Sequence, residues 1–411
     1  MATGRQDPRL APLDRLMTSF LAEHEVPGGA LAVTRAGRLV YARGFGQADL
    51  ERGEAVEPTS LFRIASLSKP LTAVAVLQLV ERGKLDLGDG AFELLDVEPY
   101  LADGAEPDPR LGRITVRHLL QHTGGWDAAE TFDPMFCSVR IARALGVEPP
   151  ARQEHIIRYT AGQPLQSEPG QRTAYSNFGY CLLGRIIEAA CGQPYEAAVR
   201  QHVLAPLGIE DMRIGRTLLA GRAEGEVTYC AGDGSKGPAV LGPELGQPVP
   251  RPYGAWYLEG FDSHGGWIGS AVDLVRFAAE FDEPSRSVLL GPASVRRMFA
   301  PPPGPPGRKP DGSPATCYYA CGWRVRRVGE GLNAWHMGRI SGTAALLVRR
   351  HDGLDWAVLF NRDAGPGGEF LAEAIDPLVH RAVDAVEEWP DDDLFPCYGL
   401  RPAGAGPSEE P

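Results

Sequence analysis

The chain has 411 residues, which allows one large domain or two to three ordinary ones, and 43% of them are apolar, enough for a sizeable core. Its 41 basic and 53 acidic residues leave a net charge of −12. An acidic chain is a poor partner for nucleic acid or an anionic membrane, because both repel negative charge. We expect neither of them as a partner.

No stretch approaches the ~18 apolar residues of a membrane span, and residues 1–22 hold no unbroken apolar run of the kind that a secretory signal needs. The seven cysteines are irregularly spaced, without a C-x-x-C pair, which favours buried free thiols in a reducing compartment. These features predict a cytoplasmic protein. They indicate neither a cofactor nor a metal.

The predicted elements begin with an amphipathic helix over residues 10–24, where leucine, methionine and phenylalanine recur at helical spacing. Residues 30–34 and 39–42 are apolar runs on either side of a short turn with Arg and Gly, which predicts a hairpin. A second helix follows Lys69. It is apolar nearly all round, so we expect it to be buried, and Gly83 is placed to end it.

From about residue 91 to 260 the pattern is mostly helical, with long loops rich in Gly and Pro. Strands return after residue 265, and a closing helix is expected over 370–386. Strands from both ends of the chain thus predict one sheet with a helical region inserted between them. The clearest helices of that region are 140–145, 153–160 and 178–190, and the later strands are 319–326, 344–349 and 357–360.

The predicted organisation is a single α/β catalytic unit over residues 10–390. Its sheet-containing part covers about 10–65 and 265–390, and its helical part covers about 66–264. Residues 391–411 are rich in Asp, Pro and Gly and are expected to form a disordered tail. No internal repeat is visible in the sequence.

The first candidate site is the sequence Ser66-Leu-Ser-Lys69, at the start of the buried helix. A spacing of three places Ser66 and Lys69 on one helical face. Serine needs a base beside it to become a nucleophile, and a lysine becomes a base only when burial lowers its pKa. Arginine cannot lose its proton, and Lys69 is one of only four lysines among the 41 basic residues. The plain alternative is a capping serine followed by a surface lysine.

Two further segments carry groups suited to the same chemistry. In Tyr175-Ser-Asn177, the phenol is a proton shuttle if a neighbouring cation lowers its pKa, and the amide can hydrogen-bond the lysine. In Trp335-His336-Met-Gly338, a glycine on an edge strand lets an acyl group approach closely. Taken alone, the first segment could be an ordinary turn and the second could hold a core histidine.

In this order, the Ser-x-x-Lys, Tyr-x-Asn and His-x-Gly segments resemble the penicillin-binding-protein and serine β-lactamase superfamily, most closely its class C branch with its carboxylesterases, D-amino peptidases and acyltransferases. Residues 114–125 are similar to that branch's Thr-x-x-x-Leu-Leu-x-His-Thr-Ser-Gly stretch, and Gly265-Gly266 to its glycine pair. The resemblance runs from about residue 10 to 390. It implies an antiparallel sheet flanked by helices, of the β-lactamase/transpeptidase type.

The resemblance also implies a role for each candidate residue. Ser66 would be the acylated nucleophile, and Lys69 would assist its deprotonation. Tyr175 would be the general base in acylation and the acid toward the leaving group, while Asn177 would orient Lys69 and the substrate. The backbone N–H groups of Ser66 and Arg339 would form the oxyanion hole.

One departure from the family pattern is His336, which stands where β-lactamases carry the lysine of Lys-Thr-Gly. That lysine helps to hold the substrate carboxylate, whereas a histidine with the ordinary pKa of about 6.5 is mostly neutral at pH 7. We therefore expect weaker carboxylate binding and little β-lactam turnover, as in the esterase-like branch. Trp267 and Trp335 flank the motif segments and are expected to form walls of the acyl pocket.

These features predict a serine hydrolase that cleaves an ester or amide of a small acyl substrate through an acyl-Ser66 intermediate. The alternative is an acyltransferase that passes the acyl group to an amine, alcohol or thiol, and the sequence leaves this choice open because it depends on water exclusion. A D-amino peptidase, a β-lactamase and a non-catalytic binding domain are further alternatives. His118 and His122 have a metal-ligand spacing, but no Glu completes a His-Glu-x-x-His site.

Overall fold

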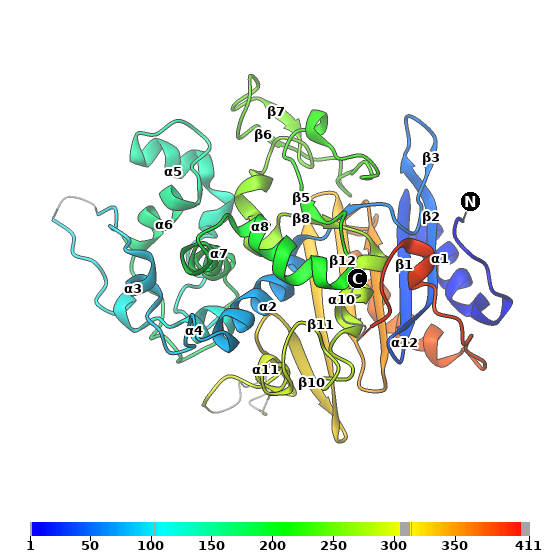
Figure 1. The fold of residues 1–411 in the computed structure, drawn as a ribbon. Helices are drawn as coiled ribbons and strands as arrows, with labels where there is room; N and C mark the ends of the chain where they lie inside the picture. Colours follow the sequence, from blue (N-terminus) through cyan, green and yellow to red (C-terminus); the bar gives the residue numbers. More distant parts are fainter. Residues whose placement is uncertain (1, 102–103, 305–312, 314, 404–411) are drawn as a thin grey trace, which may run out of the picture.

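The computed structural model describes residues 2–101, 104–304, 313 and 315–403, and within them eight strands form one antiparallel sheet. The spatial order β3-β2-β1-β13-β12-β11-β10-β9 places strands from the start of the chain beside strands from its end (Figure 1). The sheet built from both chain ends is therefore confirmed. Its strands are β1 Gly28–Arg35, β2 Arg38–Asp49, β3 Glu54–Ala55, β9 Cys317–Tyr319, β10 Arg324–Val328, β11 Gly331–Ile340, β12 Thr343–Arg349 and β13 Leu354–Phe360.

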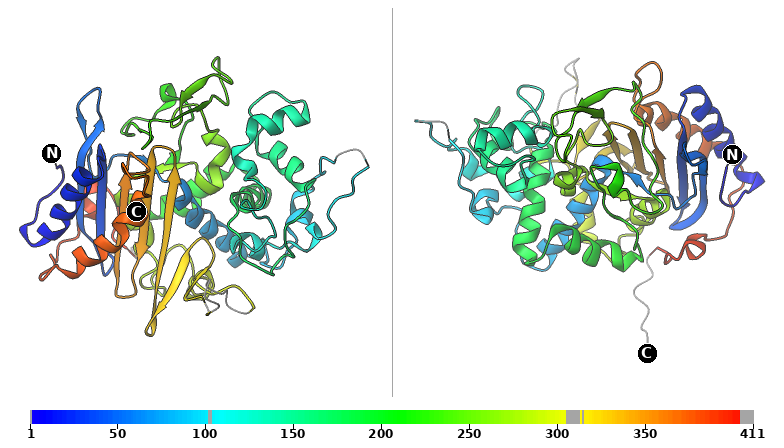
Figure 2. Two further views of the ribbon diagram at one scale, coloured as in Figure 1. Left: turned by 180° about the vertical axis from the view of Figure 1, so that it is seen from behind. Right: turned by 90° about the horizontal axis from the view of Figure 1, so that it is seen from above.

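Two helices cover one face of the sheet. These are α1 (Ala11–Glu23) and α12 (Leu371–Asp384), which pack against each other and against the strands (Figure 2). Side chains alternate between the two faces of a strand, so Leu31 of β1 packs under α1 whereas Ala30 belongs to the core on the other side. The amphipathic helix, the hairpin and the closing helix predicted from the sequence all form.

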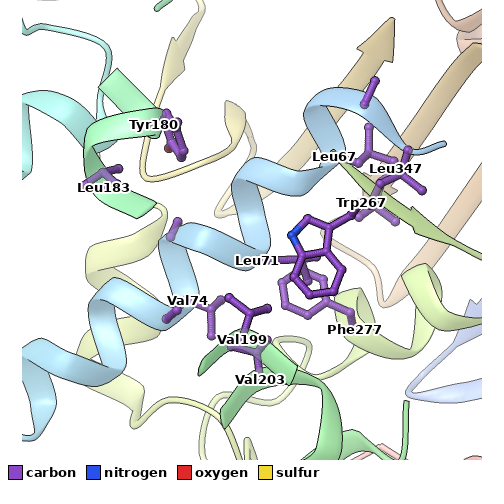
Figure 3. Close-up of a cluster of buried hydrophobic side chains, with 14 of the residues drawn as sticks. Leu67, Leu71, Val74, Tyr180, Leu183, Val199, Val203, Trp267, Phe277 and Leu347 are labelled. Atoms are coloured by element: carbon purple, nitrogen blue, oxygen red, sulfur yellow. The ribbon is translucent and has the colours of Figure 1, made fainter. Parts of the chain in front are cut away.

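The helix α10 (Ala271–Ala279) covers the other face, against β1, β2, β12 and β13, and α2 (Ser68–Glu81) begins beside that face, directly after the residues 65–67 that contact β11 and β12. Residues 68–79 of α2 are all buried, as its all-round apolar pattern predicts. Figure 3 shows Leu71 and Val74 of α2 packed among side chains from distant parts of the chain, Trp267 and Phe277 included. Because α2 lies between the sheet and the helical region, it joins the two parts of the molecule (Figure 1).

The inserted region is mostly helical and lies to one side of the sheet (Figure 2). Its longest helix, α7 (Asn177–Cys191), packs directly on α2. The other helices are α3 Ala91–Leu95, α4 Val116–Leu120, α5 Ser138–Leu145, α6 Gln153–Ala161, α8 Tyr195–Val199, α9 Asp262–Gly265 and, after α10, α11 Pro292–Met298.

Short elements complete the structure. The small strands are β4 Phe62–Arg63, β5 Arg213–Ile214 and β8 Trp267–Gly269, which form one sheet, and β6 Lys236–Pro238 and β7 Pro248–Pro250, which form another. The 3-10 helices are η1 Pro8–Leu10, η2 Ala65–Leu67, η3 Leu111–Arg113, η4 Pro134–Phe136, η6 Ala205–Leu207, η7 Leu219–Gly221, η8 Leu258–Phe261 and η9 Phe395–Tyr398, and η5 Arg200–Leu204 is a π-helix.

The single strand predicted over residues 319–326 is wrong. The chain reverses between β9 and β10, which pair antiparallel with Arg324 opposite Tyr319. Gly322 adopts a φ of +81° at this turn, a conformation that favours glycine, and a Cβ there would come within 3.0 Å of the Lys69 carbonyl oxygen. The turn residues 320–323 are Ala, Cys, Gly and Trp, so the apolar run continues through the turn and resembles part of one strand.

The disordered tail predicted for residues 391–411 is also wrong for residues 391–403, and the rest lies outside the described residues. Phe395 of η9 is fully buried, and Leu394 donates its N–H to the Leu39 carbonyl oxygen at 2.8 Å. The guanidinium of Arg276 in α10 donates to the carbonyl oxygens of Arg401 and Pro402. A few apolar anchors thus fix a segment whose overall composition is typical of disorder.

The sequence also predicts that the cysteines are buried free thiols and that no stretch is apolar enough to span a membrane. The seven cysteines are free thiols, but Cys317 and Cys397 are exposed, so the expected burial holds only for part of them. In the described part of the chain, no helix combines the length and the apolar character required to cross a bilayer.

Candidate active site

Ser66 lies in η2, two residues ahead of the first residue of α2, and its side chain is partly exposed. The preceding residue, Ala65, has a φ of +46°. A residue with a Cβ adopts this left-handed conformation at a cost of about 1–2 kcal/mol. Backbone strain of this kind concentrates at functional sites, where the surrounding structure holds it in place.

Lys69 is in the first turn of α2 and is fully buried. Its Nζ lies 3.0 Å from Ser66 Oγ, 2.8 Å from Asn177 Oδ1 and 2.8 Å from the carbonyl oxygen of His264. Burial holds the pKa of Lys69 well below the ordinary range of lysine, and the charge of Asp133 opposes this only in part. The environment therefore favours the neutral amine.

Tyr175 lies in the loop before α7, and its hydroxyl donates to Ser66 Oγ at 2.8 Å. Although 39% of the Tyr175 side chain is exposed, the hydroxyl points into the site, where desolvation raises its pKa above the ordinary range of tyrosine. Ser176 caps α7 by accepting from the Gly179 N–H, and this fixes the position of Asn177 at the first residue of the helix.

The structure thus brings together Ser66, Lys69, Tyr175 and Asn177, which the sequence places up to 111 residues apart. Ser66 Oγ lies within hydrogen-bond distance of both the Tyr175 hydroxyl and Lys69 Nζ, so it links these two groups. A nucleophile in this position can pass its proton to the uncharged amine. The protonated phenol can then assist acyl transfer as a proton donor.

The strand β11 borders this cluster through Gly338. A Cβ on Gly338 would lie 2.3 Å from the Ile64 carbonyl oxygen and 3.2 Å from the Ala65 Cβ. The space that glycine leaves is therefore filled by the chain's own backbone ahead of Ser66, and not by an approaching acyl group as the sequence suggested. Pairing with β10 ends at Trp335, so the edge of β11 beyond it faces η2, and Arg339 lies in this stretch.

His336 does not present a free nitrogen to a substrate. Its Nδ1 lies 2.8 Å from the Met337 carbonyl oxygen, which can only accept, so Nδ1 carries the proton. Its Nε2 then accepts from the Tyr319 hydroxyl at 2.6 Å. Burial is the main cause that lowers the pKa of His336 to about 3. The predicted substrate contact is not supported, and the ring instead holds Tyr319.

The two tryptophans expected in the pocket wall lie elsewhere. Trp267 is fully buried among the core side chains of Figure 3, and its Nε1 donates to the Tyr195 hydroxyl at 3.1 Å. Trp335 packs on the opposite face of the sheet, beside α12. Adjacent residues of a strand point to opposite faces, so Trp335 and His336 cannot both face the site. Position beside a motif was a poor guide to side-chain direction.

Sequence reasoning missed Asp133, whose Oδ2 accepts from Asn177 Nδ2 at 2.6 Å. The only signal for it is the Asp-Pro pair at residues 133–134, which indicates a turn and says nothing of the site. The sequence around His122 indicates only a metal-ligand spacing with His118. Its Nδ1 accepts from the Ser176 N–H at 3.1 Å, and its ring packs 4.4 Å from that of Tyr175.

A pocket of about 480 Å³ opens on the Tyr175 side of the cluster. Aromatic and apolar groups make up most of its lining, and Arg324 adds a positive charge. The residues that line it include His122, Tyr175, Pro301, Tyr318, Tyr319 and Arg324. Within the described residues, no group of three or more His, Cys, Asp or Glu side chains is arranged to hold a metal ion.

The sequence profile of the family described as Beta-lactamase matches residues 13–379. "Esterase EstB" of Burkholderia gladioli is 34% identical over 280 residues, which cover 65% of this chain and 68% of that protein. "Penicillin-binding protein 4*" of Bacillus subtilis is 28% identical over 343 residues, 83% of this chain and 69% of that protein. The structure of the octameric penicillin-binding protein homologue from Pyrococcus abyssi shares the fold, with a TM-score of 0.69 and 23% identity over 94% of this chain and 79% of that chain.

These matches confirm the family that the three motifs of the sequence resemble, and the fold class with it. They also confirm that the protein is an enzyme of the serine hydrolase and acyl-transfer type. The profile spans nearly the whole chain, including the residues around Ser66 and His336. This chain belongs to the beta-lactamase family.

Proposed function

We propose that this enzyme cleaves an ester or amide of a small molecule through an acyl intermediate on Ser66. The observation that carries the proposal is the position of Ser66 Oγ, 3.0 Å from the fully buried amine of Lys69 and 2.8 Å from the hydroxyl of Tyr175. The relative from Burkholderia gladioli bears the name of an esterase, which favours an ester as the substrate.

Lys69 is the base in this scheme. A neutral amine has two N–H groups and one lone pair. Asn177 Oδ1 and the His264 carbonyl oxygen can only accept, so they take the two N–H groups. The lone pair then faces the Ser66 hydroxyl, which can pass its proton to Lys69 as Oγ attacks the substrate carbonyl carbon.

Tyr175 is the acid. Its raised pKa keeps the phenol protonated at neutral pH, ready to donate to the leaving group as the tetrahedral intermediate collapses. The phenolate so formed regains a proton from the Lys69 ammonium, and both groups return to their starting state. This assignment differs from the general-base role that the family resemblance implies for Tyr175 in acylation, because a phenol with a raised pKa is a poor base.

The oxyanion of the tetrahedral intermediate is bound by the backbone N–H groups of Ser66 and Arg339 in this proposal. The close approach of Gly338 to Ile64 and Ala65 supports it, because it holds the β11 edge against η2. The side chain of Arg339 is directed elsewhere, toward Asp363 at 3.7 Å and the ring of Phe370. The proposal therefore assigns a role to its backbone and none to its side chain.

Acyl transfer to an alcohol, amine or thiol is the second candidate function. The pocket of about 480 Å³ beside Tyr175 supports it, because that is where a leaving group would depart and where an acceptor would enter. The aromatic lining favours an apolar acceptor and limits the water that competes with it.

Activated acyl esters of several sizes test the proposal. Intact mass of the protein should rise by the mass of the acyl group, and the rise should be absent in Ser66→Ala. The ratio of hydrolysed to transferred product, with and without alcohol or amine acceptors, separates the two functions. Absence of acylation with every ester would refute the proposal. Turnover of a penicillin at the rate of the esters would contradict the weak carboxylate binding expected from a neutral His336.

A further inference from the structure

Asp133 reaches the catalytic cluster through Asn177. The Nδ2 of Asn177 donates to Asp133 Oδ2 at 2.6 Å, while its Oδ1 accepts from Lys69 Nζ at 2.8 Å. An ionised carboxylate only accepts hydrogen bonds, so the end of the amide that faces Asp133 must be the NH₂ group. The Asp133 contact therefore decides that oxygen, and not nitrogen, faces Lys69.

Asp133 is itself held in one position. It is the N-cap of η4, where its Oδ1 accepts from the Met135 N–H at 3.0 Å and Pro134 fixes the next backbone angle. Burial raises the pKa of the Asp133 carboxyl, and the hydrogen bonds from Asn177 and Met135 oppose that change. Both oxygens thus have a donor, which leaves the carboxylate little freedom to turn away from Asn177.

We propose that Asp133 is a positioning residue for acylation: it fixes the side-chain amide of Asn177 so that Oδ1 accepts from Lys69 and the amine lone pair is directed at Ser66. This inference rests on the proposed function of Lys69 as the base. Asp133 accepts hydrogen bonds from Asn177 and Met135 and makes none with Ser66. It acts through Asn177, in a chain of contacts that ends at the nucleophile.

An amide in place of the carboxylate would reverse this arrangement. In Asp133→Asn, the new side chain can still cap η4 through its oxygen, but it presents an NH₂ group to Asn177. The Asn177 amide then gains by turning over, and its own NH₂ faces Lys69 and competes for the lone pair. Asp133→Ser keeps a good capping residue but is too short to span the same contact.

Asp7, near the N-terminus, offers a matched control. Asp7 caps η1 through the same Asp-Pro arrangement, with its side chain accepting from the Arg9 N–H at 3.0 Å. It bonds Arg9 and has no contact with Asn177 or Lys69. Asp7→Asn therefore measures what the loss of such a carboxylate costs when only the cap is affected.

The first measurement is the rate of Ser66 acylation by an activated ester. We expect Asp133→Asn and Asp133→Ser to lower it on the order of 10- to 100-fold, and Asp7→Asn to leave it unchanged. In an Asn177→Ala background, Asp133→Asn should have almost no further effect, because the residue through which it acts is gone. Wild-type rates in both Asp133 variants, or an equal loss in the Asn177→Ala background, would overturn the inference.

The second measurement does not depend on activity. Only four lysines are present, so a protein with ¹³C-labelled lysine allows Lys69 to be titrated by NMR. Tyr175 and Tyr180 face the Lys69 amine with their rings, and His122, His264 and His336 nearby have lowered pKa values, which leaves them neutral. The carboxylate of Asp133 raises the pKa of Lys69, so Asp133→Asn should lower it further.

The two measurements separate this inference from the proposed function. If wild-type protein is not acylated at Ser66, the proposed function fails whatever the titration shows. If wild-type protein is acylated but Asp133→Asn leaves both the rate and the Lys69 titration unchanged, the positioning role fails and the function stands. A fall in rate together with a fall in the Lys69 pKa supports the role, and unfolding curves of both Asp133 variants show whether each is folded.

Discussion

At the scale of single residues, the site depends on a lysine that is kept uncharged. Lys69 is fully buried beside three oxygen atoms, and this burial lowers its pKa, while the charge of Asp133 opposes the change. The pKa of Tyr175 changes in the opposite direction: it is raised, which keeps the phenol protonated. The two shifts separate a base from an acid at one pH, although both groups contact the same serine.

The pH dependence of acylation follows from these two directions. Lys69 accepts a proton only when neutral, so the rate should fall as the pH drops through its lowered pKa. Tyr175 donates only when protonated, so the rate should also fall as the pH rises through its raised pKa. Between the two limits, kcat/KM for an uncharged ester should be flat across neutral pH.

Lys69→Arg should lower kcat/KM by about 10²- to 10⁴-fold and remove the acid limb, because arginine keeps its proton at every pH used. Lys84→Arg is the control, since Lys84 is exposed and lies three residues beyond the end of α2. A pH–rate profile of each variant checks the prediction. Lys69→Arg with an acid limb like that of the wild type would show that another group is the base.

At the scale of elements, the site depends on the contact between η2 and β11. Ala65 has a left-handed backbone immediately before Ser66, and Gly338 lets the strand approach that backbone closely. The Thr343 hydroxyl of β12 donates to the Arg63 carbonyl oxygen at 2.9 Å and ties the same loop to the sheet. The nucleophile is therefore positioned by the sheet as much as by α2.

Gly338→Ala should damage the site more than the fold. Its Cβ would lie 2.3 Å from the Ile64 carbonyl oxygen, a backbone atom that can move only if η2 moves. We expect a loss of stability of about 1–3 kcal/mol, and a fall in the acylation rate of about 10²-fold because a shift of the nucleophile spoils the geometry of attack.

Gly112→Ala is the matched control, because no atom lies within 4 Å of the Cβ it would add and its φ is not left-handed. Urea unfolding and the acylation rate are measured on both variants. A Gly338→Ala protein with wild-type acylation would show that the η2–β11 contact does not position Ser66.

At the scale of the whole molecule, the two ends of the chain form one sheet, and the inserted helical part lies to one side of it. Strands β1 and β13 pair over seven residues, and the segment after α12 returns across the sheet to α10. Asp393 accepts from the Leu39 N–H at 3.1 Å, and Phe395 is fully buried in the main core. The C-terminal segment thus acts as part of the core and not as a tail.

Phe395→Ala should therefore lower the free energy of unfolding by about 3–5 kcal/mol, the usual cost of replacing a buried phenylalanine with alanine. Leu219→Ala should change it by less than about 0.5 kcal/mol, because 51% of Leu219 is exposed. Urea unfolding measures both. An effect of Phe395→Ala as small as that of Leu219→Ala would mean that the segment is detached in solution.

Much of the fold could be predicted because its signals are local. The all-round apolar pattern of α2 predicted its burial, and the paired apolar runs predicted the β1–β2 hairpin. The turn at Gly322 was missed because an apolar run continues through it, and the buried Phe395 was missed because the segment around it is rich in Asp, Pro and Gly. Periodicity is judged over several residues, so it does not detect a single turn or a single buried side chain.

The sequence by itself determined which reactive groups this protein has: a serine three residues before a lysine that must be buried, and a tyrosine and an amide at the start of another helix. Only the tertiary structure decided how they are used. It gave the Asn177 amide its direction through Asp133, 44 residues away, and it engaged both nitrogens of His336 within the chain. Residue types and local spacing set what chemistry is available, whereas hydrogen bonds between distant segments set the direction and protonation of each group.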